Sequence, residues 1–224
     1  MAKQDRAIRT RQNILEAAAV VFDERGYDAA TINEILARAE VTKGALYFHF
    51  PSKEDLALAV VDAQTEATSA LLDLPGGCRM QRLVDLGMVF AHQLLVDPVL
   101  RGSVRLTMEH GSPALPHRIH RSGPFAGWTE IHTRLLAEGK ERGEVLPDVV
   151  PSEVAELIVG AFGGINALSQ SVSDRADLER RAIVLYEHLM PSVAVPAVLA
   201  RLDMAPGRGA RALALAALEP VGAA

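Results

Sequence analysis

The chain has 224 residues, 49% of them hydrophobic and 23% charged, a balance that is typical of folded globular proteins and excludes wholesale disorder. Its net charge of −5 excludes a globally basic protein that coats nucleic acid, and its single cysteine, Cys78, excludes a disulfide framework and a thiolate zinc site. The polar N-terminus lacks the apolar segment of a secretory signal, and the longest uncharged run, 157–173, is too short and too polar for a membrane helix, so we expect a soluble cytoplasmic protein.

Hydrophobic residues recur along the chain with the 3.6-residue period of α-helices, and no convincing alternating pattern of strands is present. Together with the abundance of Ala, Leu, Glu and Arg, this period predicts an all-α fold. The helices are expected at about 8–25, 32–39, 43–48, 52–74, 79–96, 98–109, 124–142, 151–172 and 174–190. Prolines interrupt the last helix at 191 and 196, and a small Ala/Leu-rich tail follows Pro206.

Local signals mark the ends of the first helices. Gly26 stands where the first helix is expected to stop. Thr31 and Glu34 have the spacing of a capping box, in which the threonine hydroxyl accepts an N–H one turn into the helix and the glutamate reaches back. Thr42 is the N-cap expected for a very short third helix, which ends before Pro51.

Three short helices, the last two joined by a tight turn, are typical of a helix-turn-helix, whose short third helix lies in the DNA major groove. Gly44 and Ala45 are small enough to let the backbone approach the bases, and Lys43 can donate to a guanine edge or a phosphate. Tyr47 and His49 have polar tips that can reach phosphates. The other apolar side chains of this helix are expected to pack inward: Leu46, Phe48 and Phe50.

The charge distribution favours the same function, although the net charge does not. Residues 1–12 have a net charge of +3, from four basic residues and one acidic residue: Lys3, Arg6, Arg9, Arg11 and Asp5. Residues 41–53 add +2 and contain no acid, whereas acidic residues gather in 16–40. A surface formed by these two positively charged segments can bind phosphates with an affinity that falls as the salt concentration rises.

A long block, Val41–Phe50, resembles the TetR family of transcriptional repressors, as do Thr10–Phe22, Thr31–Ile35 and Lys53–Leu56. The opening residues and Val41–Phe50 further resemble the γ-butyrolactone autoregulator receptors of actinomycetes, and this likeness continues more thinly through 123–128 and 159–165. The resemblance implies three parts of the chain. They are a helix-turn-helix DNA-binding domain (1–51), a helical ligand-binding and dimerisation domain (52–205) and a C-terminal tail (206–224) that is expected to be flexible.

The resemblance also implies a function, that of a repressor that binds double-stranded operator DNA as a homodimer and is released by a γ-butyrolactone or butenolide signal. Such a quorum-sensing repressor controls secondary metabolism and antibiotic production. One alternative is a family member that responds to antibiotics or other hydrophobic compounds, and another is a helical interaction module without DNA binding. No metal, cofactor or membrane partner is expected. An enzyme is a distant alternative, because the motifs of hydrolases, phosphate-binding loops and zinc proteases are all missing.

On the positions that match the family motif, the residues implied to contact DNA are Thr42, Lys43, Gly44, Tyr47, His49 and Lys53. Lys43 would read a base and the others would mainly hold phosphates. One departure from the family lies in the turn, where Glu40 stands in place of the usual glycine. If Glu40 adopts the positive φ that such a turn often needs, about 1 kcal/mol of backbone strain is expected.

The ligand site is predicted mainly from the resemblance, because the pocket tryptophan of the butyrolactone receptors matches Trp128. Without the resemblance, a lone tryptophan on an apolar stripe is as a rule part of the core. Gln64 is predicted either to hydrogen-bond a lactone or to face solvent. The other residues expected to line an apolar site for a small acyl ligand are Phe90, Thr129, Ala161, Phe162 and Ile165.

The dimer interface is expected on the last two long helices. Gly160 and Gly164 lie four residues apart on one helical face, where absent side chains allow a close approach of another backbone. That approach is consistent either with a four-helix dimer interface, which the resemblance favours, or with packing inside one subunit.

Overall fold

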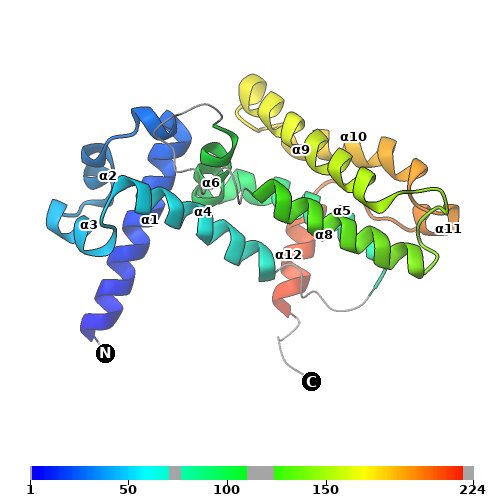
Figure 1. Ribbon diagram of the computed structural model, residues 1–224, viewed down its shortest axis with the longest axis horizontal. Helices are drawn as coiled ribbons and strands as arrows, with labels where there is room; N and C mark the ends of the chain where they lie inside the picture. The colour runs from blue at the N-terminus through cyan, green and yellow to red at the C-terminus, as the bar shows by residue number, and fades with distance from the viewer. Residues whose placement is uncertain (1, 71–76, 110–123, 219–224) are drawn as a thin grey trace. The chain divides into compact units, whose positions relative to one another are not determined.

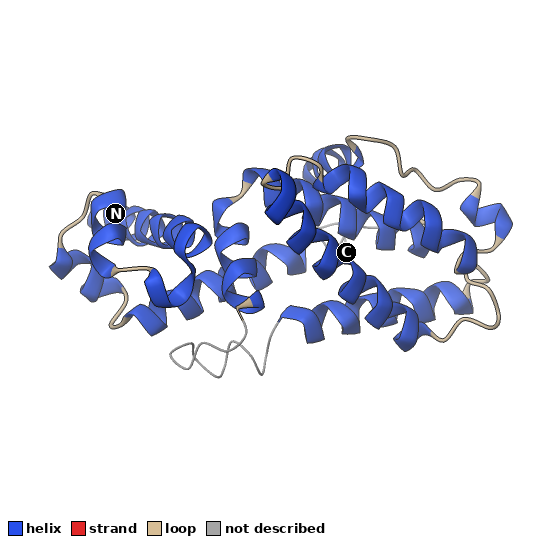
Figure 2. Ribbon diagram, turned by 90° about the horizontal axis from the view of Figure 1, so that it is seen from above, coloured by secondary structure: helices blue, strands red, loops and turns tan. Residues whose placement is uncertain are grey.

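The computed structural model describes residues 2–70, 77–109 and 124–218, and of these the side chains of 2, 3, 64–70, 124, 217 and 218 are left out (Figure 1). Within these ranges the chain forms helices and no β-strand, and Figure 2 shows only helices and connecting loops. One isolated antiparallel bridge joins Val145 to Ala194. The predicted all-α fold is therefore confirmed.

Most helices begin and end close to the predicted limits, but α1 begins at Ala2, whereas the first helix was expected from residue 8. In chain order they are α1 (Ala2–Ala29), α2 (Ile32–Ala39), α3 (Lys43–His49), α4 (Lys53–Ala70), α5 (Arg79–Val96), α6 (Pro98–Met108), α8 (Pro124–Glu141), α9 (Pro151–Ser173), α10 (Leu178–Leu189), a 3₁₀ turn (Met190–Ser192), α11 (Pro196–Leu199) and α12 (Arg208–Leu218). The predicted helix end at 74 lies outside the described residues.

Two predicted limits differ from the structure for reasons of backbone geometry. The last long helix begins at Leu178 instead of residue 174, because Asp174 and Arg175 have φ values of 49° and 67° in the left-handed region and end α9 there. Gly26 does interrupt α1, with φ 76° and ψ 176°, but one more helical turn follows it before Ala30. The left-handed φ explains why glycine occupies this position.

The chain divides into two compact units, one of residues 1–70 and 97–124 and the other of 71–96 and 125–224. The core of the first unit contains residues of α1, α2, α3, α4 and α6, so the helix-turn-helix shares its core with α4 and α6. The fully buried members include Ile14, Phe22, Ile35, Leu46, Leu56 and Leu106. The domain boundaries at 51 and 205 stay predictions.

α6 crosses α1 at a point where the two backbones touch. A Cβ atom added to Gly102 would lie 2.3 Å from the carbonyl oxygen of Ala19 and 2.7 Å from its Cα, so any larger residue would push the two helices apart. Next to this crossing, the guanidinium Nε of Arg101 donates to Asp23 at 3.1 Å. These contacts fix α6 on α1.

The predicted caps are confirmed. The Thr31 hydroxyl accepts the Glu34 N–H at 3.2 Å and the Glu34 carboxylate accepts the Thr31 N–H at 3.0 Å, which completes the capping box. The Thr42 hydroxyl accepts the Ala45 N–H at 3.2 Å and begins α3. Between them Glu40 has φ 52° and ψ 40°, the left-handed conformation expected for this turn.

Replacing Glu40 with glycine is expected to stabilise the protein by about 1 kcal/mol, because glycine adopts a positive φ without the steric cost of a Cβ. Urea denaturation followed by circular dichroism measures this gain. The matched variant Glu40→Ala keeps the Cβ and should gain nothing. Equal stabilisation by both substitutions would show that the carboxylate, not the backbone, is the source of the effect.

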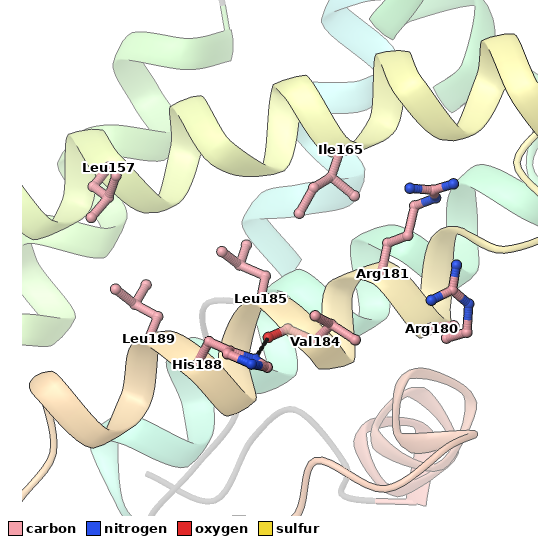
Figure 3. A pocket seen from close by; sticks show the side chains of 8 residues that line it. All are labelled: Leu157, Ile165, Arg180, Arg181, Val184, Leu185, His188 and Leu189. Atoms are coloured by element: carbon pink, nitrogen blue, oxygen red, sulfur yellow. Dashed lines mark hydrogen bonds between the residues drawn. The ribbon is translucent and has the colours of Figure 1, made fainter.

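In the second unit α9 and α10 lie side by side, with a groove of about 450 Å³ between them (Figure 3). Leu157 and Ile165 line it from α9. Val184, Leu185 and Leu189 line it from α10, with Arg180, Arg181 and His188 also contributing. The groove therefore has an apolar floor and basic groups on α10.

α5 carries contacts to both α10 and α12. Gly87 receives the ring of Tyr186, since an added Cβ would collide with the phenol, and the buried Tyr186 hydroxyl has no hydrogen-bond partner among the described residues. Burial and the nearby Asp85 carboxylate raise the pKa of Tyr186, with burial the larger cause.

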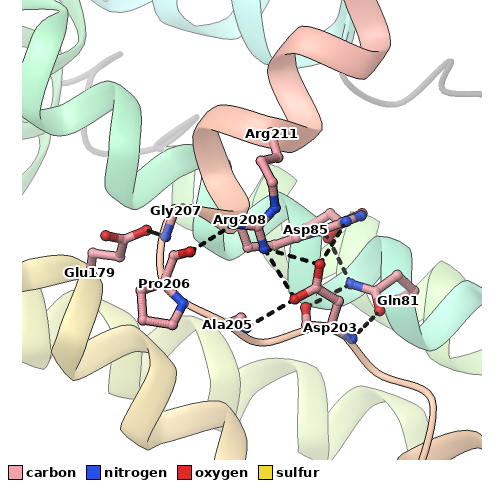
Figure 4. A network of polar contacts seen from close by, with 9 residues as sticks. All are labelled: Gln81, Asp85, Glu179, Asp203, Ala205, Pro206, Gly207, Arg208 and Arg211. Carbon is pink, nitrogen blue, oxygen red and sulfur yellow. Dashed lines mark hydrogen bonds and ion pairs between the residues drawn. The ribbon is translucent and has the colours of Figure 1, made fainter.

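The C-terminal helix is held by a polar network (Figure 4). Asp85 on α5 accepts two hydrogen bonds from Arg208 at 2.6 Å, and both side chains are largely buried. Asp203 accepts hydrogen bonds from Arg208 and Arg211, and Glu179 accepts the Gly207 N–H at 2.7 Å. Residues 208–218 of the predicted tail are thus a helix docked on α5.

Candidate DNA-binding surface, ligand site and dimer face

The short helix α3 is fixed to the core by one side and open on the other. Leu46 is fully buried and Phe50, its C-cap, is 3% exposed, so both hold the helix against α1 and α4. On the other side Thr42, Lys43 and Gly44 are exposed, and an added Cβ at Gly44 would meet no atom within 4 Å. This open face is where another molecule can approach the backbone of α3.

The prediction for Phe48 was wrong, because its side chain is 80% exposed and does not pack inward. Successive residues of a helix are rotated by about 100°, so Phe48 lies roughly opposite Leu46 on α3 and cannot share its burial. Its ring meets the ring of His49 edge to face at 5.0 Å, and neighbouring Tyr47 is 40% exposed. The open face of α3 therefore carries two exposed aromatic side chains, Tyr47 and Phe48, which suit contact with thymine methyl groups or sugars.

Two lysines near this face lie over tyrosine rings. The Lys43 ammonium is 5.9 Å from the ring centre of Tyr47, and the Lys53 ammonium is 4.5 Å from that of Tyr27. Lys53 is half-buried, and desolvation lowers its pKa although the carboxylates of Asp28, Glu109 and Glu34 act in the opposite direction. His49 is half-buried at the end of α3. All six predicted DNA-contacting residues thus lie on or beside α3.

Four rings from three helices form a cluster in the second unit. Phe90 on α5 meets Trp128 on α8 at 5.1 Å and Phe162 on α9 at 5.6 Å, both edge to face. His132 lies one turn beyond Trp128, with ring centres 6.0 Å apart. Three of the predicted ligand residues, Phe90, Trp128 and Phe162, are therefore brought together, and His132 joins them without having been singled out from the sequence.

The remaining predicted ligand residues lie in different places. The Thr129 hydroxyl donates to the Phe125 carbonyl at 2.8 Å within α8. Ala161 is half-buried on α9, and Ile165 lines the groove between α9 and α10. Gln64 belongs to α4, but its side chain lies outside the described residues. The ligand-binding roles of all these residues stay predictions.

His132 is the buried polar member of the ring cluster, and only 4% of it is exposed. Its Nδ1 lies 2.8 Å from the Trp128 carbonyl oxygen, a contact that requires a proton on Nδ1 and leaves Nε2 of the neutral ring as an acceptor. Desolvation lowers the pKa of His132 and outweighs the opposite effect of this hydrogen bond. The cluster therefore holds a neutral imidazole.

The free energy of unfolding is expected to fall as the pH drops below 6.5, the ordinary pKa of histidine, because His132 binds a proton more readily in the unfolded chain than in the fold. Urea denaturation above and below this pH measures the loss. Because His132→Leu removes the titrating group, its stability should depend less on pH in this range. An unchanged pH dependence in that variant would contradict the assignment.

The outer faces of α9 and α10 carry apolar side chains that no part of the described chain covers. Leu157, Leu168 and Val172 on α9 are 56%, 50% and 67% exposed, and Val184 on α10 is 42% exposed. A Cβ added to Gly160 or Gly164 would meet nothing within 4 Å. The two glycines thus do not serve close packing with any described part of their own subunit, and their face is open to another molecule.

Other classes of site find no support within the described ranges. No group of three or more His, Cys, Asp or Glu there is arranged to hold a metal ion. The histidines at 110, 117 and 120 lie outside those ranges. No single described helix is long and apolar enough to cross a membrane, and α5 and α6 reach that threshold only as a bent pair.

Comparisons with family models, with known proteins and with solved structures agree on one family. The model of "Bacterial regulatory proteins, tetR family" matches residues 14–60. The chain is 43% identical to the A-factor receptor protein of Streptomyces griseus over 202 residues, which cover 90% of this chain and 70% of that protein.

Two solved structures extend the comparison. CprB from Streptomyces coelicolor, solved in complex with its biological operator sequence, is 34% identical with a TM-score of 0.72 over 96% of this chain and 100% of that chain. A γ-butyrolactone receptor described as an ArpA-like protein is 34% identical with a TM-score of 0.71 over 95% and 96% of the two chains.

Proposed function

The chain belongs to the tetR family of bacterial regulatory proteins, and we propose that it represses transcription by placing α3 of each subunit of a dimer in the major groove of operator DNA, until a γ-butyrolactone-type signal releases it. It is a ligand-responsive regulator of antibiotic production and not an enzyme. It acts in the cytoplasm, where bacterial DNA lies.

The observation that best supports DNA binding is that one side of α3 is buried in the core while its other side is exposed. Leu46 and Phe50 anchor it in the core, while Lys43, Gly44 and Tyr47 face outward with no covering side chain over the glycine. Lys43 is positioned at the N-terminal end of α3, where recognition helices meet base edges. Thr42 caps this end, while His49 ends α3 and Lys53 begins α4, and all three contact phosphates. Phe48 adds an apolar contact that the sequence did not predict.

The dimer forms through the open face of α9 and α10. In a two-fold dimer the same patch of each subunit meets its copy, so the exposed leucines and valines of this face become buried on both sides. Gly160 and Gly164 then allow the two α9 helices to approach closely. Two recognition helices held in this way meet successive major grooves of one operator.

The ring cluster of Phe90, Trp128 and Phe162 forms the wall of the ligand site. A mostly apolar site with one neutral polar group, His132, suits an uncharged lipophilic molecule such as a lactone with an acyl chain. The names of the A-factor receptor and the γ-butyrolactone receptor support a lactone signal more than an antibiotic.

Release of DNA requires the ligand to bind more tightly to the released form than to the DNA-bound form. A decisive switch needs a difference of several kcal/mol between the two affinities, and by linkage operator DNA weakens ligand binding by the same factor. We propose that the ligand acts through α4, which begins at the phosphate-contacting Lys53 and carries Gln64. A tilt of α4 would move the two recognition helices out of register with the grooves.

The experiment is a paired titration. The unmodified protein first selects its own duplex from a random-sequence pool, and synthetic γ-butyrolactones of different acyl-chain length are then added to the complex. Because Trp128 is the only tryptophan, its fluorescence reports occupancy while electrophoretic mobility reports release. We expect both to change at the same lactone concentration, and Trp128→Ala to require more lactone for release. No selected duplex would contradict the DNA-binding role, and no response to any lactone would contradict the signal.

A further inference from the structure

Glu109 follows the last residue of α6 and joins this end of the helix to the bend in α1. Its carboxylate accepts the backbone N–H of Tyr27 at 2.7 Å, a contact between residues 82 positions apart in the sequence. Gly26 interrupts α1 immediately before Tyr27, and an N–H at the start of a helical segment lacks a partner inside that segment. Glu109 therefore supplies an acceptor that the bend in α1 leaves out.

The carboxylate fits closely against the bend. A Cβ atom added to Gly26 would lie 2.7 Å from Oε1 of Glu109 and 3.1 Å from its Oε2, so a larger residue at position 26 would push the carboxylate away. Glycine thus serves two needs at this position, the left-handed φ of 76° and the room that the carboxylate occupies. A hydrogen bond from an N–H to an ionised carboxylate is also stronger than one to a neutral acceptor.

Tyr27, whose N–H Glu109 accepts, also contacts a residue that is proposed to bind DNA. The Tyr27 side chain is 6% exposed, and its ring stacks on that of Phe22 with 6.0 Å between the ring centres. The Lys53 ammonium lies 4.5 Å from the centre of the Tyr27 ring, within the range of a cation–π interaction. Glu109, Tyr27 and Lys53 therefore form one chain of contacts inside the first unit.

We infer that Glu109 is a positioning residue for DNA binding, because it fixes the backbone of Tyr27 and so the ring that holds the Lys53 side chain in place for a phosphate. This inference rests on the proposed contact of Lys53 with operator DNA. A lysine that is held before binding loses less side-chain freedom when it meets the phosphate, and the affinity rises accordingly. Because a phosphate contact carries no base information, the gain applies to any duplex.

The test compares two variants that lose the same charge. Glu109→Gln keeps an oxygen that can accept the Tyr27 N–H, whereas Glu109→Ala removes the acceptor. Each is titrated with the duplex selected by the unmodified protein and with a scrambled duplex of the same composition, both alone and combined with Lys53→Ala. Limited acetylation of the DNA-free proteins, followed by mass spectrometry, measures the reactivity of Lys53 relative to Lys43. Circular dichroism checks that the variants are folded.

We expect Glu109→Ala to bind both duplexes at least about fivefold more weakly than Glu109→Gln, since each subunit of a dimer must then order a free lysine on binding. In the Lys53→Ala background the two variants should bind alike. The acetylation of Lys53 relative to Lys43 should rise in Glu109→Ala and stay at its original level in Glu109→Gln.

A second variant keeps the test decisive if Glu109→Ala does not fold. Glu109→Asp retains the charge but shortens the side chain by one methylene, which withdraws the carboxylate from the Tyr27 N–H. It is compared with the unmodified protein, which has the same charge. We expect weaker binding of both duplexes and a more reactive Lys53.

Equal affinities of Glu109→Ala and Glu109→Gln, or equal acetylation of Lys53 in both, would overturn the inference. A difference that persists in the Lys53→Ala background would also overturn it, because Glu109 would then act on another part of the first unit. Weaker binding of the selected duplex alone would assign the effect to base recognition by α3. Failure of the unmodified protein to bind any duplex would instead remove the proposed function, and the role of Glu109 in DNA binding with it.

Discussion

Replacing Lys43 with alanine is expected to abolish selective operator binding without unfolding the protein. A lysine that reads a base edge contributes about 1–3 kcal/mol of discrimination, and a dimer carries two copies, so the loss is about 2–6 kcal/mol, or roughly 30-fold to 10⁴-fold in affinity. Lys43 is exposed and meets only the ring of Tyr47 at 5.9 Å, so its removal should leave the unfolding free energy within about 0.5 kcal/mol. Fluorescence anisotropy with a labelled duplex measures the first quantity and urea denaturation the second.

The ratio of affinities for selected and scrambled duplexes separates base reading from simple charge. Lys43→Ala should lower this ratio, whereas Lys53→Ala, which removes a proposed phosphate contact, should weaken both duplexes alike. Arg142→Ala removes an exposed charge from the second unit and serves as the control. If Lys43→Ala weakens binding to both duplexes equally, Lys43 contacts a phosphate and another residue of α3 recognises the bases.

A charge placed on the outer face of α9 is expected to separate the dimer and, with it, to remove operator binding. Leu168 is 50% exposed in the single chain. Burial of a leucine contributes about 1.5–3 kcal/mol, and two-fold symmetry doubles the loss, so Leu168→Glu should weaken dimerisation by at least about 10²-fold before any cost of burying two carboxylates. Analytical ultracentrifugation over a concentration series measures the dimer constant.

The control for this experiment introduces the same charge elsewhere. Ala210 is exposed on α12, and Ala210→Glu should leave both the dimer constant and operator affinity unchanged. Thermal unfolding of Leu168→Glu at low protein concentration checks that the subunit itself still folds. A dimer constant that Leu168→Glu does not alter would place the two-fold interface on another surface.

Much of the helix-turn-helix could be predicted because its signals are local. The capping box of Thr31 and Glu34, the N-cap at Thr42 and the left-handed Glu40 each depend on a few neighbouring residues, and the structure confirms all three. Phe48 shows the limit of this approach. In a helix of seven residues the apolar side chains do not form one stripe, and only the position of α3 relative to α1 decides which of them is buried.

The ring cluster in the proposed ligand site depends on contacts between distant parts of the chain, which a sequence does not display. Phe90, Trp128 and Phe162 were expected as separate lining residues, and the structure adds that their rings meet in one cluster. His132 was missed, although its position one turn after Trp128 on the same helical face was a usable signal. The buried Tyr186 against Gly87 had no signal, because nothing in the sequence pairs a tyrosine of α10 with a glycine of α5.

The crossing of α1 and α6 has a mechanical consequence. Side chains between two helices normally absorb small displacements by changing rotamer, but at Gly102 the backbone of α6 rests directly on the backbone of Ala19. No side chain separates the two backbones at this crossing, so a displacement of α6 there is passed directly to α1 with little room for side chains to absorb it.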